Sequence, residues 1–111
     1  MLNLLFVLLI IHALLDFPLQ GDSVAINKNP HANTPLQKFV PWYYWMGSHA
    51  LVHGGGVLLV TGSTLLALLE TFAHFIIDLG KCHLKYSIHV DQALHLVCKI
   101  IWVLIAVFVL R

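Results

Sequence analysis

Histidines and carboxylates recur in this sequence four residues apart. On a helix, residues at that spacing lie one turn apart on one face, so both side chains of a pair can bind the same ion. The HExxH zinc motif uses this geometry. The pairs are His12 and Asp16, His49 and His53, Glu70 and His74, His74 and Asp78, and Asp91 and His95. Imidazole nitrogens and carboxylate oxygens are common ligands of divalent metals, so the pattern predicts metal binding.

The composition of the chain indicates where these pairs must lie. Hydrophobic residues make up 59% of the 111 residues and charged residues 10%, whereas soluble domains have about 45–50% and 25%. So few charges could not cover so much apolar surface in water, and we therefore expect an integral membrane protein. The net charge is +1 and no basic stripe is present, which argues against a nucleic-acid partner.

Four apolar segments predict transmembrane helices. They cover about residues 2–20, 42–62, 64–79 and 91–110, with Gly21 and Gly80 as expected helix ends. Each can cross a hydrocarbon core of about 30 Å, and a backbone in lipid must satisfy its own hydrogen bonds by forming a helix. The first segment lacks the basic start and the cleavage site of a signal peptide, so we expect a retained helix. Residues 21–41 are predicted to be a loop.

These segments predict a single all-α domain, residues 1–111, built as an antiparallel up-down bundle of four transmembrane helices. In such a bundle, the helix ends that carry the acid and imidazole pairs all lie on one side. The loop lysines are expected on that same side: Lys28, Lys38, Lys81 and Lys85. The positive-inside rule then places both lysine-bearing loops in the cytoplasm and both termini, with Arg111, in the periplasm of a bacterial inner membrane.

The carboxylates within or beside the apolar segments need compensation, because an ionisable group at the bilayer centre costs about 2.5–3.5 kcal/mol. Lys99 is the one strong cation within a predicted span and could pair with Glu70. One or two divalent ions would neutralise the remainder, with zinc as the leading candidate and manganese or iron as alternatives. The predicted ligands are His12, Asp16, His49, His53, His74, Asp78, Asp91 and His95. A proton relay, a metal-free hydrogen-bonded network and purely structural contacts between helices are the competing explanations.

Other polar and small residues have simpler interpretations. His31, His83 and His89 lie in predicted connections and are expected to be solvated. The run Gly54–Gly56 is expected to let helices approach closely rather than to shape a substrate groove. The aromatic run Trp42–Trp45 is typical of an interfacial belt.

Several of these residues resemble the motifs of a known family. His12-Ala-Leu-Leu-Asp16-Phe-Pro-Leu-Gln20 resembles the opening H-x-x-x-D-F-x-L-Q of small bacterial and phage membrane proteins grouped as domain of unknown function 3307. The later matches are Asn27-Lys28, His49, His74-Phe-Ile-Ile-Asp78 followed by Lys81, and Asp91-Gln92-Ala-Leu-His95. The resemblance spans residues 12–95 and implies a bacterial or phage origin, but no activity. In spacing and residue type alone, the pairs also resemble those of zinc-dependent phospholipases C and related membrane metal hydrolases.

Together these features predict a membrane-embedded, metal-dependent hydrolase of a lipid or phospholipid-like substrate, with membrane lipids as its partners. Its metal would acidify a bound water and polarise a phosphoryl or acyl oxygen. Glu70 or the Asp16 carboxylate would act as general base. Lys28 or Lys81 would hold a headgroup phosphate as a point charge.

Two other hypotheses stay open. The chain could transport or sense metal ions or protons, although beyond Glu70 and Lys99 the outer half of the bundle offers little to carry an ion. It could instead be a phage or bacterial accessory protein with a structural metal or polar cluster that binds a host membrane protein or forms a homo-oligomer. The sequence names neither the substrate nor the metal.

Overall fold

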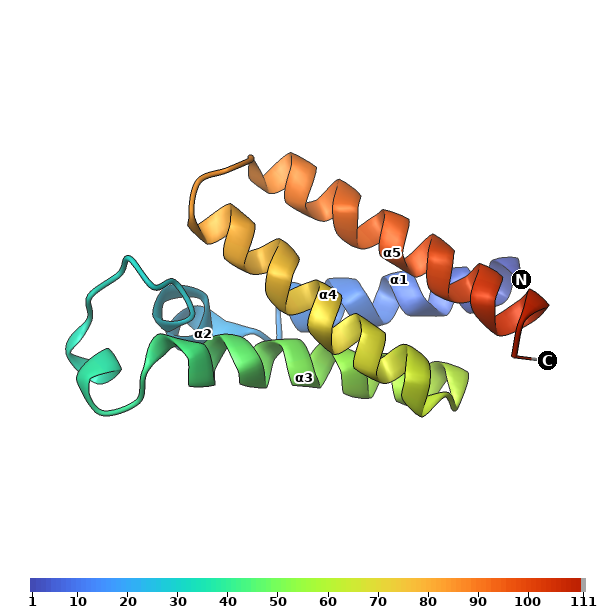
Figure 1. Cartoon of the computed structure of the whole chain (residues 1–111), viewed down its shortest axis with the longest axis horizontal. Coiled ribbons are helices and arrows are strands. Elements are labelled where there is room, and N and C mark those ends of the chain that lie inside the picture. Colours follow the sequence, from blue (N-terminus) through green and yellow to red (C-terminus); the bar gives the residue numbers. More distant parts are fainter. Residues whose placement is uncertain (111) are drawn as a thin grey trace.

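The computed structural model describes residues 1–110, and these residues form helices and no strands. The elements are α1 (Leu2–Asp16), α2 (Gly21–Asn27), the 3-10 helix η1 (Pro35–Lys38), α3 (Trp42–Thr61), α4 (Thr64–Cys82) and α5 (Ile88–Phe108) (Figure 1). The predicted all-α class is therefore confirmed. Arg111, which the orientation prediction uses, lies outside the described residues.

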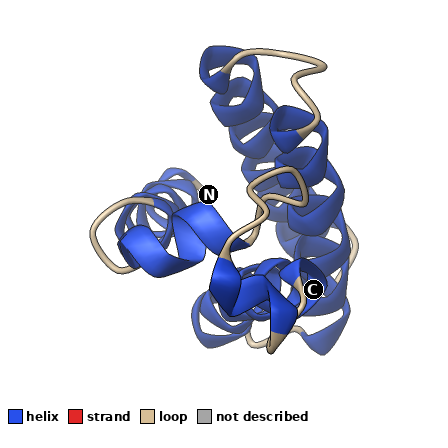
Figure 2. Cartoon of the chain, turned by 90° about the vertical axis from the view of Figure 1, so that its left-hand side faces the viewer, coloured by secondary structure: helices blue, strands red, loops and turns tan. Residues whose placement is uncertain are grey.

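The four long helices run up and down. α1 packs against α3 and α5, and α4 packs against the same two helices, so the four helices close into a ring. α2 packs on the outside against α3. The start of α1, the end of α5 and the turn between α3 and α4 share one end of the molecule in Figure 1, and the segments 28–41 and 83–87 share the other. Figure 2 views the molecule from this loop end. The lysine-bearing loops thus lie together, as predicted.

The first helix ends earlier than predicted. α1 stops at Asp16, residues 17–20 form a turn, and α2 follows from Gly21 to Asn27. Pro18 explains the early end, because a proline disfavours a helical conformation of the residue before it. The prediction that Gly21 ends the first helix is wrong, since its φ of +75° instead makes the left-handed corner at which α2 begins. Residues 21–41 are likewise not all loop, because they contain α2 and η1.

The prediction that the third long helix ends at Gly80 is also wrong. α4 continues through Gly80 to Cys82, and a Cβ at position 80 would lie 2.8 Å from the Tyr86 ring. The absence of a side chain at Gly80 therefore makes room for Tyr86, in the loop that joins α4 to α5. Tyr86 donates a hydrogen bond to the Ile77 carbonyl, and burial raises the pKa of its phenol. α5 starts earlier than predicted because the Ser87 hydroxyl caps it.

The glycine run of α3 allows neighbouring helices to approach closely. A Cβ at Gly54 would lie 2.7 Å from the Ala67 carbonyl oxygen of α4, and one at Gly56 would lie 2.6 Å from the Ile11 side chain of α1. Gly55 between them faces open space. The expected close packing is therefore confirmed for the outer two glycines. It brings the histidines of α3 near both flanking helices.

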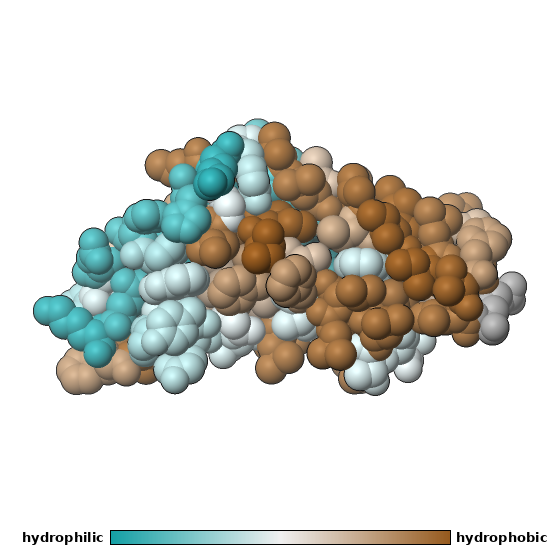
Figure 3. All heavy atoms as spheres, in the orientation of Figure 1, coloured by the Kyte–Doolittle hydropathy of each residue, from teal (hydrophilic) through white to brown (hydrophobic). Residues whose placement is uncertain are grey.

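The bundle has a polar interior near the loop end and an apolar outside. Phe6, Leu59 and Phe72 are among many large hydrophobic side chains that are exposed. In Figure 3, hydrophobic side chains cover the end with the chain termini and hydrophilic ones cover the loop end. Buried apolar residues form a separate cluster toward the terminal end, made of Leu8, Val57, Leu66, Trp102 and Val103.

The described helices differ in their suitability to cross a membrane. By length and composition α5 alone qualifies, whereas α1 and α2 qualify only as a pair that is bent by 82°. α4 carries Glu70, Asp78 and Lys81, and these charges lower its mean hydropathy. The structure thus shows an all-helical bundle, and the four membrane spans stay a prediction.

Candidate metal centre

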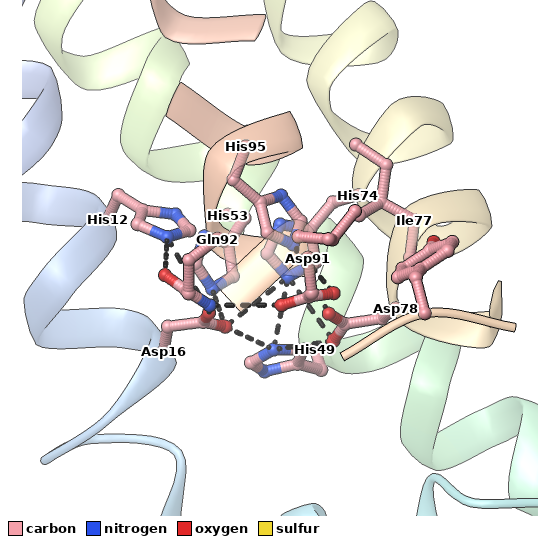
Figure 4. A network of polar contacts seen from close by, with 12 residues as sticks. His12, Asp16, His49, His53, His74, Ile77, Asp78, Asp91, Gln92 and His95 are labelled. Carbon is pink, nitrogen blue, oxygen red and sulfur yellow. Dashed lines mark hydrogen bonds and ion pairs between the residues drawn. The ribbon is translucent and has the colours of Figure 1, made fainter. Parts of the chain in front are cut away.

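Three histidines and one aspartate converge where α1, α3 and α4 meet. Asp16 is the last residue of α1, and its Oδ1 lies 3.1 Å from His49 Nε2, 3.3 Å from His53 Nε2 and 3.5 Å from His74 Nε2. The Nε2 atoms of His49 and His74 are 3.2 Å apart. All four side chains are buried, and Figure 4 shows their polar atoms turned toward one another.

These separations match those of a tetrahedral metal site. Four donors about 2.0–2.1 Å from a zinc ion lie about 3.3–3.4 Å from one another. Four of the six separations among these donor atoms, 3.1–3.5 Å, bracket that value, and all six are within 4.8 Å. His53 Nε2 is buried and makes no hydrogen bond within the described residues, although Asp16 Oδ1 lies 3.3 Å away, and the His53 ring stacks on that of His74 with 3.7 Å between the ring centroids. We call these four donors the primary group: Asp16, His49, His53 and His74.

A second set of donors adjoins the primary group on α5. Asp91 and His95 begin that helix, with 3.6 Å between Asp91 Oδ1 and His95 Nε2. Together with Asp16 they offer three ligand atoms within 4.8 Å of one another. His12 lies beside them, because its Nε2 is 3.6 Å from Asp16 Oδ2. Asp91, His95 and Asp16 are called the secondary group below.

Asp78 joins the two groups to a buried lysine. Its Oδ2 lies 3.4 Å from His49 Nε2, and its Oδ1 lies 3.3 Å from His95 Nε2. Lys28, at the end of α2, donates to Asp78 Oδ2 at 2.8 Å and to Gln20 Oε1 at 2.5 Å. Lys28 was predicted to hold a headgroup phosphate, but its ammonium group is buried and bound to Asp78. Its charge therefore acts inside the bundle.

The loop after α2 is organised to hold Lys28 in place. Asn27 is buried and donates to the Ser23 carbonyl. Its side-chain oxygen accepts from Thr34, and its carbonyl accepts from Gln37. The Asn-Lys pair in the family resemblance thus has distinct roles, since Asn27 fixes the loop and Lys28 neutralises an acid.

A layer below the primary group pairs Glu70 with Lys99. Lys99 Nζ lies 2.6 Å from Glu70 Oε1, and Trp102 Nε1 donates to Oε2 at 2.6 Å. The expected charge pair is therefore present. Glu70 Oε1 also lies 3.4 Å from Nδ1 of His74, although that nitrogen makes no hydrogen bond within the described residues. Both Glu70 oxygens thus have partners, and the role of Glu70 as general base stays a prediction.

The buried carboxylates outnumber the buried lysines, which leaves a deficit of positive charge. Within residues 1–110, four carboxylates and two lysines are buried, and the ion pairs join Lys28 to Asp78 and Lys99 to Glu70. The carboxylates of Asp16 and Asp91 remain without a lysine partner. If the buried histidines are neutral, as metal-binding histidines are, the cluster carries about two uncompensated negative charges when its acids are ionised. Protonation of two buried histidines would offset these charges. One divalent ion would also offset them.

The structure brings together every residue that the sequence predicted as a ligand. They are His12, Asp16, His49, His53, His74, Asp78, Asp91 and His95, and all of them are buried. Lys81 is half-buried at the end of α4 and makes no ion pair within the described residues. His31, His83 and His89 are exposed, as expected, although His31 and His83 share a hydrogen bond of 2.7 Å.

Sequence reasoning missed Gln92. Its Nε2 donates to Asp16 Oδ2 at 2.7 Å and to Asp91 Oδ2 at 3.0 Å, and its Oε1 lies 3.0 Å from His12 Nε2. It therefore links α5 to the acid and imidazole of α1. The available signal was its position next to Asp91 within the motif Asp91-Gln92-Ala-Leu-His95, because neighbouring residues at a helix start can both face a bundle interior.

Fold and site together define a small helical bundle with a buried histidine–aspartate centre of metal-binding geometry. The family model for the protein family of unknown function DUF3307 matches residues 4–110. The chain belongs to this family, as its motifs indicated. No curated protein and no solved structure matches the chain.

The Glu70–Lys99 pair yields a stability prediction. Replacing one partner of a buried ion pair leaves the other charge uncompensated, which costs about 3–5 kcal/mol. Lys99→Met should therefore lower the free energy of unfolding by about that amount in a detergent denaturation titration. The double variant Glu70→Gln/Lys99→Met should recover most of the loss, because both charges are removed and the glutamine oxygen still accepts from Trp102.

The exposed Lys85 provides the matched control. Lys85→Met should change the free energy of unfolding by about 0.5 kcal/mol or less. Equal losses in Lys85→Met and Lys99→Met, or no recovery in the double variant, would show that the pair does not neutralise the interior.

Proposed function

We propose that this chain is a membrane-embedded metalloprotein that holds a zinc ion in its primary group and hydrolyses a lipid or phospholipid-like substrate. The observation that carries the proposal is the convergence of three imidazole Nε2 atoms on Asp16 Oδ1 at separations of 3.1–3.5 Å. Such a set of donors, buried and short of positive charge, is costly without a cation. Three nitrogens and one carboxylate oxygen suit zinc better than manganese or iron.

A location in the bacterial inner membrane is supported by the distribution of polarity. The proposal places all four long helices across the bilayer, with segments 28–41 and 83–87 in the cytoplasm and the start of α1 in the periplasm. Exposed apolar side chains surround buried charged ones, which suits lipid as the solvent. The long axis of 47 Å exceeds the hydrocarbon thickness of about 30 Å.

A groove between α1 and α3 supports a lipid as the substrate. A cavity of about 120 Å³ is lined by His49 and by Gln20 and Ser48. A neighbouring apolar groove of about 430 Å³ continues past Gly55 and shares Leu15 with the first cavity, along with Val52. In this proposal a headgroup reaches the primary group from the cavity while an acyl chain lies in the groove.

The protein's own residues have distinct roles in this proposal. A zinc ion bound to the primary group would have to expand beyond its four protein ligands to take up a water, which it would acidify, and to polarise a phosphoryl or acyl oxygen. Asp78 is the proposed general base, because its Oδ2 adjoins His49 Nε2 at 3.4 Å without being needed among the four donors. Glu70 orients His74, and Lys28 holds Asp78 in place. Lys81 remains a proposed headgroup contact.

A structural metal is the second candidate function. Four protein donors complete a tetrahedral zinc site, which is the rule for structural sites, whereas catalytic sites keep a position open. An accessory protein with such a site would bind a membrane partner or a second copy of itself. Transport is less well supported, because the apolar cluster that includes Leu8, Leu66 and Trp102 fills the bundle beyond Glu70 and Lys99.

The metal proposal predicts a stoichiometric ion. Detergent-purified protein should contain about one zinc per chain by elemental analysis, since the primary group offers one tetrahedral site. His53→Gln should lose most of that zinc and lower the melting temperature, because bound metal stabilises the folded state. The exposed His89 gives the control His89→Gln, which should keep both the zinc and the melting temperature.

Wild-type protein without zinc, manganese or iron, and with a melting temperature that chelators leave unchanged, would refute the metal and the hydrolase together. Zinc-loaded protein that leaves lipid phosphates and phospholipids intact would refute hydrolysis of these substrates and favour the structural metal.

The membrane proposal predicts labelling from opposite sides. After Cys82 and Cys98 are replaced by serine, single cysteines at the exposed positions Asn3, Asn33 and Lys85 can be tested with an impermeant thiol reagent. In intact cells with a permeabilised outer membrane, Asn3→Cys should be labelled, whereas Asn33→Cys and Lys85→Cys should react only in inverted vesicles. Labelling of all three positions from one side would contradict the proposed topology.

A further inference from the structure

Asp91 is a buried acid, and one of its carboxylate oxygens has no hydrogen-bond partner within the described residues. Its side chain has no exposed surface, and the oxygen without a partner is Oδ1. His95 Nε2 lies 3.6 Å from this oxygen. A buried carboxylate oxygen without a partner is costly. A cation bound beside His95 would satisfy it.

The neutral side-chain amide of Gln92 lies between the carboxylates of Asp16 and Asp91. Gln92 Nε2 bridges Asp16 Oδ2 at 2.7 Å and Asp91 Oδ2 at 3.0 Å (Figure 4). An amide supplies hydrogen bonds but no net charge. The two carboxylates that lack a lysine partner are therefore held together by a group that does not neutralise them.

The carboxylate of Asp16 belongs to both groups of donors. Its Oδ1 faces the imidazoles of the primary group, and its Oδ2 faces Gln92 and His12 on the other side. A carboxylate that presents one oxygen to each of two sites is suited to bridge two ions, and bridged ions in two-metal sites lie about 3.5–4 Å apart.

Charge balance restricts when a second ion could bind. One divalent ion in the primary group offsets the two uncompensated charges of the cluster. A second divalent ion would then leave the buried cluster with about two positive charges, which is again costly. A phosphate monoester carries about −1.5 to −2 at pH 7 and would restore neutrality, whereas a phosphodiester with one charge would not.

From this geometry we infer that Asp16, Asp91 and His95 form a second divalent-cation site, which fills together with a dianionic phosphate monoester. The inference rests on the proposed zinc in the primary group and specifies the substrate class of the proposed hydrolase. Asp91 and His95 bind the second ion, Asp16 bridges the two ions, and the phosphoryl oxygens complete the coordination of both.

The test measures zinc per chain by elemental analysis after equilibrium dialysis of the detergent-purified full chain. Dialysis against zinc alone should give about one ion per chain, because a second would be uncompensated. Added glycerol 3-phosphate, a dianion, should raise the value to about two. Dimethyl phosphate, a monoanion with similar oxygen donors, should leave it at about one and serves as the ligand control.

Two variants assign the second ion to its site. Asp91→Asn preserves the side-chain volume, and His95→Gln changes no charge when the histidine is neutral. Both should keep about one zinc ion and show no increase with glycerol 3-phosphate. His89→Gln, on the same helix but exposed, should respond as the wild type does. Circular dichroism identifies folded variants, and an unchanged response in either folded variant would overturn the assignment.

Lipid and soluble sources of the phosphate can be distinguished with nanodiscs. Phosphatidic acid should raise the zinc content to about two per chain without added glycerol 3-phosphate, and phosphatidylglycerol, a phosphodiester, should not. If glycerol 3-phosphate alone gives the second ion, the phosphate is a soluble ligand. One zinc ion under every condition, or two without any phosphate, would refute this inference and leave the proposed function standing. No bound zinc would refute the proposed function itself.

Discussion

The Asp16 carboxylate of α1 contacts side chains of α3, α4 and α5, and the need to neutralise it and its buried neighbours explains much of the structure. Lys28 and Lys99 each neutralise one acid, and each requires a structural feature to reach it. Lys28 reaches Asp78 because the extra helix α2 and the loop that Asn27 fixes carry it there. Lys99 reaches Glu70 in a layer below the histidines, where Trp102 also donates a hydrogen bond to Glu70. Asp16 and Asp91 have no lysine partner within the described residues, which is why a cation is central to the proposed function.

The sequence was sufficient to predict the four long helices and the assembly of the site, but not α2 and η1. Apolar segments long enough for helices, joined by short polar connections, predicted an up-down bundle, and acid and imidazole pairs at matching helix ends then had to meet. The ion pair of Glu70 and Lys99 followed from the same logic, because a buried lysine near a buried acid has few other partners. Membrane spans are less directly supported, since the charges inside α4 lower its mean hydropathy.

Features that depend on tertiary packing could not be predicted in the same way. Gly80 is typical of a helix end, yet here it makes room for Tyr86, which comes from a loop six residues later. Lys28 is typical of a solvated loop lysine until α2 brings it to Asp78. The bend at residues 17–20 was predictable in principle from Pro18, whereas the bridging role of Gln92 required knowing that α1 and α5 are neighbours.

The central claim is that three imidazoles and one carboxylate bind a single zinc ion inside the bundle. X-ray absorption at the zinc edge of the purified protein tests it most directly, because it identifies ligand atoms without depending on activity. We expect about four nitrogen or oxygen neighbours at about 2.0–2.2 Å, with the outer-shell scattering of about three imidazole rings and no sulfur. A spectrum with sulfur neighbours, or with six oxygen neighbours and no imidazole scattering, would contradict the proposed metal centre.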